Sequence, residues 1–187
     1  MTTIESTHLP LRSGTWAIDT IHSTVEFTVR HLGISKVRGR FNSFEGAASI
    51  GAALDDVAIT ASIDLASVDT NNPDRDGHLR SADFFDADKN PRMDFLSNSV
   101  SQNADGEFVL TGDLTLNGVT NPISLDVEFH GAQLYPMDEH IHAGFTATGA
   151  ISRKAYGVDF DIPLGADKMA IGDKVAIELE IQLVEPS

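Results

Sequence analysis

The sequence predicts an all-β domain, an antiparallel β-barrel of about eight strands with one short helical insertion. Apolar and polar residues alternate with a period of two along most of the chain, which is typical of strands with one buried and one solvated face. Only the stretch 67–90 replaces this alternation with helix signals, and Asn117-Gly118 is a strong hairpin signal. Because open sheet edges invite aggregation, we expect the sheet to close on itself.

The first part of the domain predicts a short strand over 16–18 and then a hairpin. The strand over 24–30 carries Val25, Phe27 and Val29 on its apolar face. A connection over 32–36, which includes Gly33, leads to a strand over 37–44. In that strand Arg38 and Arg40 have outward parity, and we expect them to pair across the strands with Glu26 or its neighbours.

A weak strand over 47–56 and a clear strand over 57–65 precede the helical insertion. Asn72-Pro73 combines a helix cap with a proline in the first turn, which predicts a helix start. We predict one short helix followed by a second turn over 81–85. Strand patterns then resume over 92–96, 108–116, 123–129, 145–151 and 175–183, and the segment 152–168 is irregular.

The composition limits the classes of function. The 187 residues suit one domain, and we predict a flexible leader over 1–14 followed by a barrel domain over 15–187. A net charge of −15 argues against nucleic-acid binding and against broad adhesion to anionic membranes. The absence of cysteine excludes disulfides and thiolate chemistry and fits a reducing compartment. Because the leader lacks the apolar core of a secretory signal, and no apolar run is long enough to span a bilayer, we expect a cytoplasmic protein.

The inner faces of the strands offer almost no polar atoms, so a ligand inside the barrel has to be apolar. The predicted lining consists of inward-facing residues and of two phenylalanines of the helical insertion: Phe27, Val29, Phe41, Ile59, Ile63, Phe84, Phe85, Leu110, Leu125, Val127, Phe129, Phe145, Ile177 and Leu179. The pattern alone leaves two alternatives open, a hollow barrel and a solid core in which these side chains fill each other. Small inner residues, namely Ala61, Ala147 and Gly149, favour the hollow barrel.

The insertion from His78 to Phe85 is a candidate lid, or alternatively a fixed plug. Basic residues around the first hairpin are candidates for binding a polar head group: Arg30, His31 and Arg38. For Arg30 and Arg38 we favour simple cross-strand pairing, because both have outward parity.

Metal binding and catalysis have little support in the sequence. Zinc sites usually need three or four ligands, and the spacing of the seven histidines provides no typical set. Asp19, His22 and Ser23 are adjacent in sequence, but a catalytic triad is defined by geometry, and we expect a hydrogen-bonded turn there. We therefore expect no metal, no cofactor and no enzymatic activity.

Several blocks of the sequence together resemble the YceI family. They run in family order over residues 15–184: Asp19-x-x-His22-Ser23-x-x-x-Phe27-x-Val29-x-His31, Gly39-x-Phe41-x-x-Phe44-x-Gly46, His78-Leu79-Arg80-Ser81-x-Asp83-Phe84-Phe85-Asp86, Gly112-x-Leu114-Thr115-Leu116-x-Gly118-Val119-Thr120-x-Pro122, Gly149-x-Ile151-x-Arg153 with Tyr156-Gly157, and Ile171-Gly172-Asp173-x-Val175. The resemblance implies an extended lipocalin-like barrel with a helix against its opening. It also implies a homodimer and a long isoprenoid or related amphiphile as the ligand.

From the apolar inner faces and this resemblance we predict a carrier or sequestering protein without enzymatic activity. The expected ligand is the isoprenoid chain of a polyprenyl phosphate or a polyprenyl quinone, with the head at the mouth of the barrel. One alternative is a stress-related protein-interaction module whose dimer surface matters and whose cavity is incidental. A lesser alternative is a metal-dependent enzyme.

Overall fold

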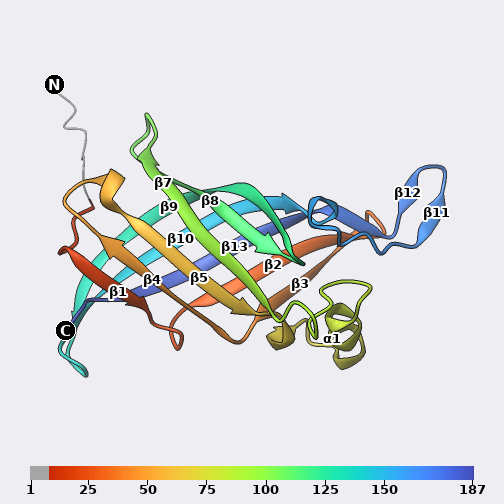
Figure 1. Ribbon diagram of the computed structural model, residues 1–187, viewed down its shortest axis with the longest axis horizontal. Helices are drawn as coiled ribbons and strands as arrows, with labels where there is room; N and C mark the ends of the chain where they lie inside the picture. Colours follow the sequence, from red (N-terminus) through yellow and green to blue (C-terminus); the bar gives the residue numbers. More distant parts are fainter. Residues whose placement is uncertain (1–8) are drawn as a thin grey trace.

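The computed structural model describes residues 9–187 as a long, closed antiparallel barrel with one helix at one end (Figure 1). Its elements are β1 (Gly14–Ile18), β2 (Thr24–His31), β3 (Ser35–Phe41), β4 (Phe44–Ile50), β5 (Ala58–Asp64), β6 (Val68–Asp69), α1 (Pro73–Arg80), β7 (Arg92–Gln102), β8 (Phe108–Leu116), β9 (Val119–Tyr135), β10 (His140–Ser152), β11 (Pro163–Gly165), β12 (Lys168–Met169) and β13 (Ile171–Val184). Short 3₁₀ turns lie at Leu54–Asp56, Leu65–Ser67 and Lys154–Tyr156. The predicted fold class is confirmed.

The barrel has eight strand positions. Three of these positions are each formed by two shorter strands separated by a bend. Strands β1 and β2 both pair with β13, β1 pairs with β4, and β2 pairs with β3. Next to them β4 pairs with β5, and β3 pairs with β6. The pairs β1/β2, β3/β4 and β5/β6 therefore each act as one bent strand, followed in the ring by β7, β8, β9, β10 and β13.

The bend between β3 and β4 occurs where polar residues replace the alternating pattern. The strand predicted over 37–44 is interrupted at Asn42 and Ser43, whose amides bond to the carbonyl and the hydroxyl of Ser67 at 3.1 and 3.0 Å. The bend between β3 and β4 is thus joined to the bend between β5 and β6. The bend separates the end of the barrel that carries β2, β3 and α1 from the end that carries β1 and β4 (Figure 1).

The helical insertion forms as predicted. Asn72 caps α1 by accepting a hydrogen bond from the Arg75 amide at 2.9 Å, and Pro73 occupies the first turn. The buried carboxylate of Asp76 accepts hydrogen bonds from the amide and hydroxyl of Thr70, at 2.8 and 2.5 Å, which fixes the helix to the end of β6.

The ends of the barrel differ in their packing. The first described residues and the C-terminus lie at one end of the barrel, where Trp16 is 1% exposed and donates its indole N–H to the Arg12 carbonyl at 2.9 Å (Figure 1). Leu9 and Leu11 also pack against the core there. Residues 1–8, on which most of the predicted leader falls, lie outside the described residues.

Candidate functional site

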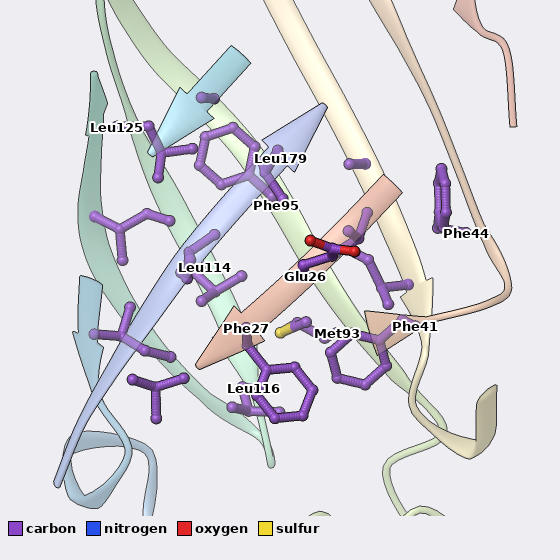
Figure 2. Close-up of a pocket in the computed structure, with 18 of the residues that line it drawn as sticks. Glu26, Phe27, Phe41, Phe44, Met93, Phe95, Leu114, Leu116, Leu125 and Leu179 are labelled. Atoms are coloured by element: carbon purple, nitrogen blue, oxygen red, sulfur yellow. The ribbon is translucent and has the colours of Figure 1, made fainter. Parts of the chain in front are cut away.

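The interior of the barrel is hollow and forms a cavity of about 520 Å³. Inward-facing side chains from all eight strand positions line it, and Figure 2 shows phenylalanine and leucine side chains, among them Phe27, Phe95 and Leu114, around a common space. The volume lies within the range of about 300–1,000 Å³ that is usual for ligand pockets. Of the two alternatives for the interior, the solid core is therefore wrong.

The predicted lining residues reach this cavity with one exception. All of them except Phe129 contribute to its wall. Phe129 packs against Phe145, with ring centroids 5.1 Å apart, and Phe145 is the ring that lines the cavity. Among the small residues, Ala61 and Ala147 do line the cavity, but a Cβ on Gly149 would lie 2.6 Å from Leu125 Cδ2, so the space beside this glycine is filled by leucine.

The mouth of the cavity is at the end of the barrel that carries α1. Six residues of the wall are exposed to solvent, and all of them belong to β2, α1 and the segment before β11: Glu26, Arg30, His31, Arg75, His78 and Ile162. At the opposite end the wall residues are buried or half-buried, for example Ile50, Val100 and Leu183. The cavity is thus closed at the end that carries β1 and the C-terminus and open beside α1.

A buried arginine organises the irregular segment at the mouth. Arg153 is 5% exposed, and its five N–H groups all donate hydrogen bonds: Nε to the Gly172 carbonyl, Nη1 to the carbonyls of Val158 and Phe160, and Nη2 to the Ile171 carbonyl and to Asp161 Oδ2. The ion pair with Asp161 is 2.6 Å long and both side chains are buried. This clamp holds residues 153–161 and residues 171–172 together at the end of the barrel.

Asp161 completes the clamp on the other side. Its Oδ1 accepts hydrogen bonds from the amides of Ile162 and Ile171 at 2.9 and 3.0 Å. Burial of the carboxyl raises its pKa, but the two amide hydrogen bonds and the charge of Arg153 outweigh burial and hold the pKa of Asp161 below its usual value. The carboxylate is therefore charged at neutral pH, and the clamp is complete.

An aromatic cluster joins α1 to this segment. The ring of His78 contacts Phe84 and Phe160 edge-on, with centroids 5.0 and 4.8 Å apart, and its Nε2 lies 2.8 Å from Asp83 Oδ2. Phe84 and Phe85, which were predicted to face a ligand, both line the cavity. The helix and its following turn thus form one side of the mouth.

The structure places two of the three predicted head-group residues at the mouth of the cavity. Arg30 and His31 belong to the wall at the mouth, and Arg38 does not. Arg40 pairs with Asp69 at 3.4 Å rather than with Glu26, which lies opposite it in the strand register. In the described part of the chain, Arg30 and Arg38 form no ion pair, so the cross-strand pairing expected for them is wrong: Lys36 and Thr28 lie opposite them in the register.

His22 and His142 each contact an acidic side chain of a neighbouring turn, Asp19 and Asp138. His22 Nδ1 lies 2.7 Å from Asp19 Oδ2, as predicted for this turn, whereas the Ser23 hydroxyl bonds to the backbone of Gln182. The side chains of Asp19, His22 and Ser23 are therefore not arranged as a triad.

Within residues 9–187 no group of three or more His, Asp or Glu side chains is placed to hold a metal ion. Over the same residues, no helix has the length and apolar character needed to cross a bilayer.

Several residues that line the cavity were not predicted from the sequence. Phe95, Leu114 and Leu116 share the inward parity of their strands, so the alternation was a sufficient signal for them. Phe160 comes from the irregular segment and Leu9 from the predicted leader, where no periodic pattern marks them.

Several known proteins are similar to this chain in sequence and in fold. A model of the YceI-like domain matches residues 16–183. Two relatives, each called a UPF0312 protein, are similar over most of their length. The one from Staphylococcus epidermidis is 36% identical over 163 residues, which cover 86% of this chain and 91% of the relative. The one from Staphylococcus aureus strain USA300 is 37% identical over 166 residues, which cover 87% of this chain and 93% of the relative.

Solved structures with the same fold include three bacterial proteins. Burkholderia cenocepacia BcnA has a TM-score of 0.75 at 21% identity, covering 90% of this chain and 99% of BcnA. The Campylobacter jejuni YceI protein has a TM-score of 0.70 at 29% identity, covering 84% and 90%. A polyisoprenoid binding domain from Saccharophagus degradans has a TM-score of 0.64 at 16% identity, covering 91% and 98%. From the barrel, its cavity and the match over residues 16–183, we conclude that this chain belongs to the family of YceI-like domains.

Proposed function

We propose that this protein binds one long isoprenoid chain, or a related amphiphilic lipid, inside the barrel and thereby stores, transports or sequesters it. The observation that carries the proposal is the apolar cavity, which runs from Val100 and Leu183 at the closed end to Arg75 and His78 at the mouth. One slender apolar chain fits such a space, because the walls offer almost no hydrogen-bond partners along its length.

The apolar lining of the cavity supports a bound ligand. Because the cavity opens to solvent, its apolar walls are exposed to water unless a ligand covers them, which is unfavourable. A hydrocarbon chain that fills the cavity covers these walls and gains the free energy of leaving water.

The polar groups of the wall gather at the mouth, which favours an amphiphile with its head there. Arg30, His31 and Arg75 lie at this end, and a phosphate or a quinone oxygen is a suitable acceptor for their N–H groups. The polyisoprenoid binding domain of Saccharophagus degradans, which has the same fold, supports an isoprenoid as the chain. We propose a polyprenyl phosphate or a polyprenyl quinone as the ligand, bound without a catalytic step.

Native mass spectrometry of gently purified protein tests this function, together with uptake of added polyprenyl phosphate or quinone from detergent micelles. Ala147→Phe places a ring inside the cavity, and Ala150→Phe makes the same change on the outward face of β10. We expect uptake by the natural protein and by Ala150→Phe, and loss of uptake in Ala147→Phe. A bare polypeptide mass and no uptake by the natural protein would refute the proposal. If Ala147→Phe does not fold, Ala61→Phe on β5 replaces it.

The homodimer and the cytoplasmic location stay predictions. Light scattering during gel filtration measures the first, and cell fractionation measures the second.

A further inference from the structure

Exposed aliphatic side chains surround the mouth of the cavity on two hairpin tips. In the turn between β2 and β3, Ile34 is 82% exposed and Leu32 is 42% exposed. In and beside the β11–β12 hairpin, the exposed side chains are Ile162, Leu164 and Met169. The two tips are neighbours, because the Leu32 amide donates to the Ala170 carbonyl at 2.8 Å. Both project from the end of the barrel that carries α1 (Figure 1).

In the β2–β3 turn, Leu32 occupies a position whose backbone conformation favours asparagine. The Ile34 amide bonds to the His31 carbonyl at 3.2 Å, and both central residues have positive φ, 55° at Leu32 and 72° at Gly33. This is the pattern of a type I′ turn, which prefers Asn-Gly. A bulky L-residue is strained in this conformation, and burial offsets the strain only in part, since Leu32 remains 42% exposed. The exposed part of this side chain is available to a partner of the folded monomer.

The same hairpin concentrates unpaired positive charge. No Asp or Glu occurs between Glu26 and Glu45, whereas Arg30, Lys36 and Arg38 lie on the outward face of the hairpin, with Arg30 directly opposite Lys36. Like charges in this position repel each other. Within the described chain none of these three residues has an ion-pair partner. In the second hairpin the charges of Asp167 and Lys168 offset each other. An anionic surface at this end supplies the missing counter-charge.

The opposite end of the barrel shows that exposed aliphatic side chains alone do not define such a face. The turn between β9 and β10 also exposes apolar side chains, Leu134 at 53% and Met137 at 81%. Its charged residues are Asp138 and Glu139, so an anionic surface is repelled there. Because the whole chain has a net charge of −15, attraction to anionic lipid requires a locally basic surface, which the β2–β3 hairpin at the mouth provides.

We propose that the tips of the β2–β3 and β11–β12 hairpins form a membrane-docking face, on which the aliphatic side chains enter the interface of an anionic bilayer. Two convex tips with aliphatic ends suit a deformable bilayer better than a flat protein surface. Docking places the mouth against the membrane, so that a lipid tail passes into the cavity without crossing water. The docking itself does not depend on the proposed ligand.

The test measures sedimentation of the full chain with vesicles of phosphatidylcholine, with and without phosphatidylglycerol. We expect binding to the anionic vesicles only, weakened by salt. Leu32→Ser with Ile34→Ser is expected to lower the partition coefficient by at least roughly tenfold, because two aliphatic side chains no longer leave water. Lys36→Gln with Arg38→Gln is expected to lower it by about fivefold per charge. The matched control, Leu134→Ser with Met137→Ser, is expected to leave it unchanged.

Leu32→Asn separates docking from a structural role. Asn tolerates positive φ, so this variant is expected to unfold at a higher temperature and still to bind anionic vesicles less tightly. Weaker vesicle binding combined with lower stability would mean that Leu32 serves the fold, which contradicts the proposal.

Three other results would overturn the docking face. The first is equal sedimentation of the natural protein and the Leu32→Ser/Ile34→Ser variant. The second is equal loss of binding in the β9–β10 control. The third is loss of a dimer in the Leu32→Ser/Ile34→Ser variant without any change in vesicle binding, which would make these tips an interface between copies. Lipid uptake from micelles, measured on the same variants, reports on the cavity separately.

Discussion

The two ends of the barrel are held together by different interactions. At the closed end, buried apolar side chains such as Trp16, Ala143 and Leu183 pack together, the buried ring of His142 contacts Asp138 and Gln182, and Arg12 pairs with Glu185 at 3.4 Å. At the open end, the irregular segment over 153–172 is held by the hydrogen bonds of Arg153 and Asp161, and α1 by those of Asp76.

This difference explains why only one end has a mouth. At the closed end, apolar side chains such as Trp16 and Leu183 pack against one another and block the tube. Hydrogen bonds and ion pairs fix directions and distances, so at the open end they hold a segment in place around an opening without filling it. Polar contacts occur at both ends, so the difference lies in the apolar packing that fills the closed end.

The largest expected effect comes from breaking the polar network. Arg153→Ala leaves Asp161 as a buried, uncompensated charge and removes five hydrogen bonds, so we expect a loss of about 3–5 kcal/mol in the free energy of unfolding. Urea denaturation measures the loss. Lys154→Ala, at the exposed neighbouring position, is the control and is expected to change stability by less than about 0.5 kcal/mol. A loss below about 1 kcal/mol for Arg153→Ala would show that the open end is held by other contacts.

The second prediction compares aromatic truncations in packed and hollow surroundings. Trp16→Ala removes a side chain enclosed on all sides, and we expect it to cost about 3–5 kcal/mol. Phe27→Ala removes a ring that faces the cavity, so that only the transfer free energy of about 1.5–3 kcal/mol is lost. Denaturation of lipid-free protein measures both values. Equal losses would mean that the cavity is filled in solution.

The third prediction concerns acid. The folded-state pKa of Asp161 lies below its unfolded value, so the stability that its charge contributes is present above about pH 4 and is lost as the pH falls through the folded pKa. Asp161→Asn has no such titration at this position. The variant is therefore expected to be less stable at neutral pH, and the difference from the natural protein narrows at low pH by up to about 1.4 kcal/mol per pH unit.

Urea denaturation at a series of pH values measures this narrowing. Asp159→Asn, an exposed change in the same segment, serves as the control. A difference between Asp161→Asn and the natural protein that stays constant with pH would exclude the carboxylate as the source of the stability.

The smallest expected effect is a gain at the tip of the open end. Leu32→Asn relieves the positive φ of a bulky residue and is expected to stabilise the fold by up to about 1 kcal/mol. Thermal unfolding measures the gain, and Met137→Asn in the β9–β10 turn is the comparison at the other end, where we expect no gain. A destabilised Leu32→Asn would show that the leucine contributes to folding after all.

Much of the fold was predictable because it follows from local patterns. Alternation with a period of two placed Phe27, Leu125 and Ile177 on the inner face, and Asn72-Pro73 marked the start of the helix. The interruption at Asn42 and Ser43 was not predicted, because Ser67, which stabilises it, comes from a distant part of the sequence.

The sequence by itself determined which side chains face inward, since the side-chain direction of a strand depends only on parity. It did not determine that they enclose a space, because the volume inside a barrel depends on how far its strands tilt and bend, which no single strand specifies. Only the tertiary structure decided which end opens. That choice rests on Arg153, Asp161 and Phe160, whose partners are brought together by the closure of the barrel and not by their spacing along the chain.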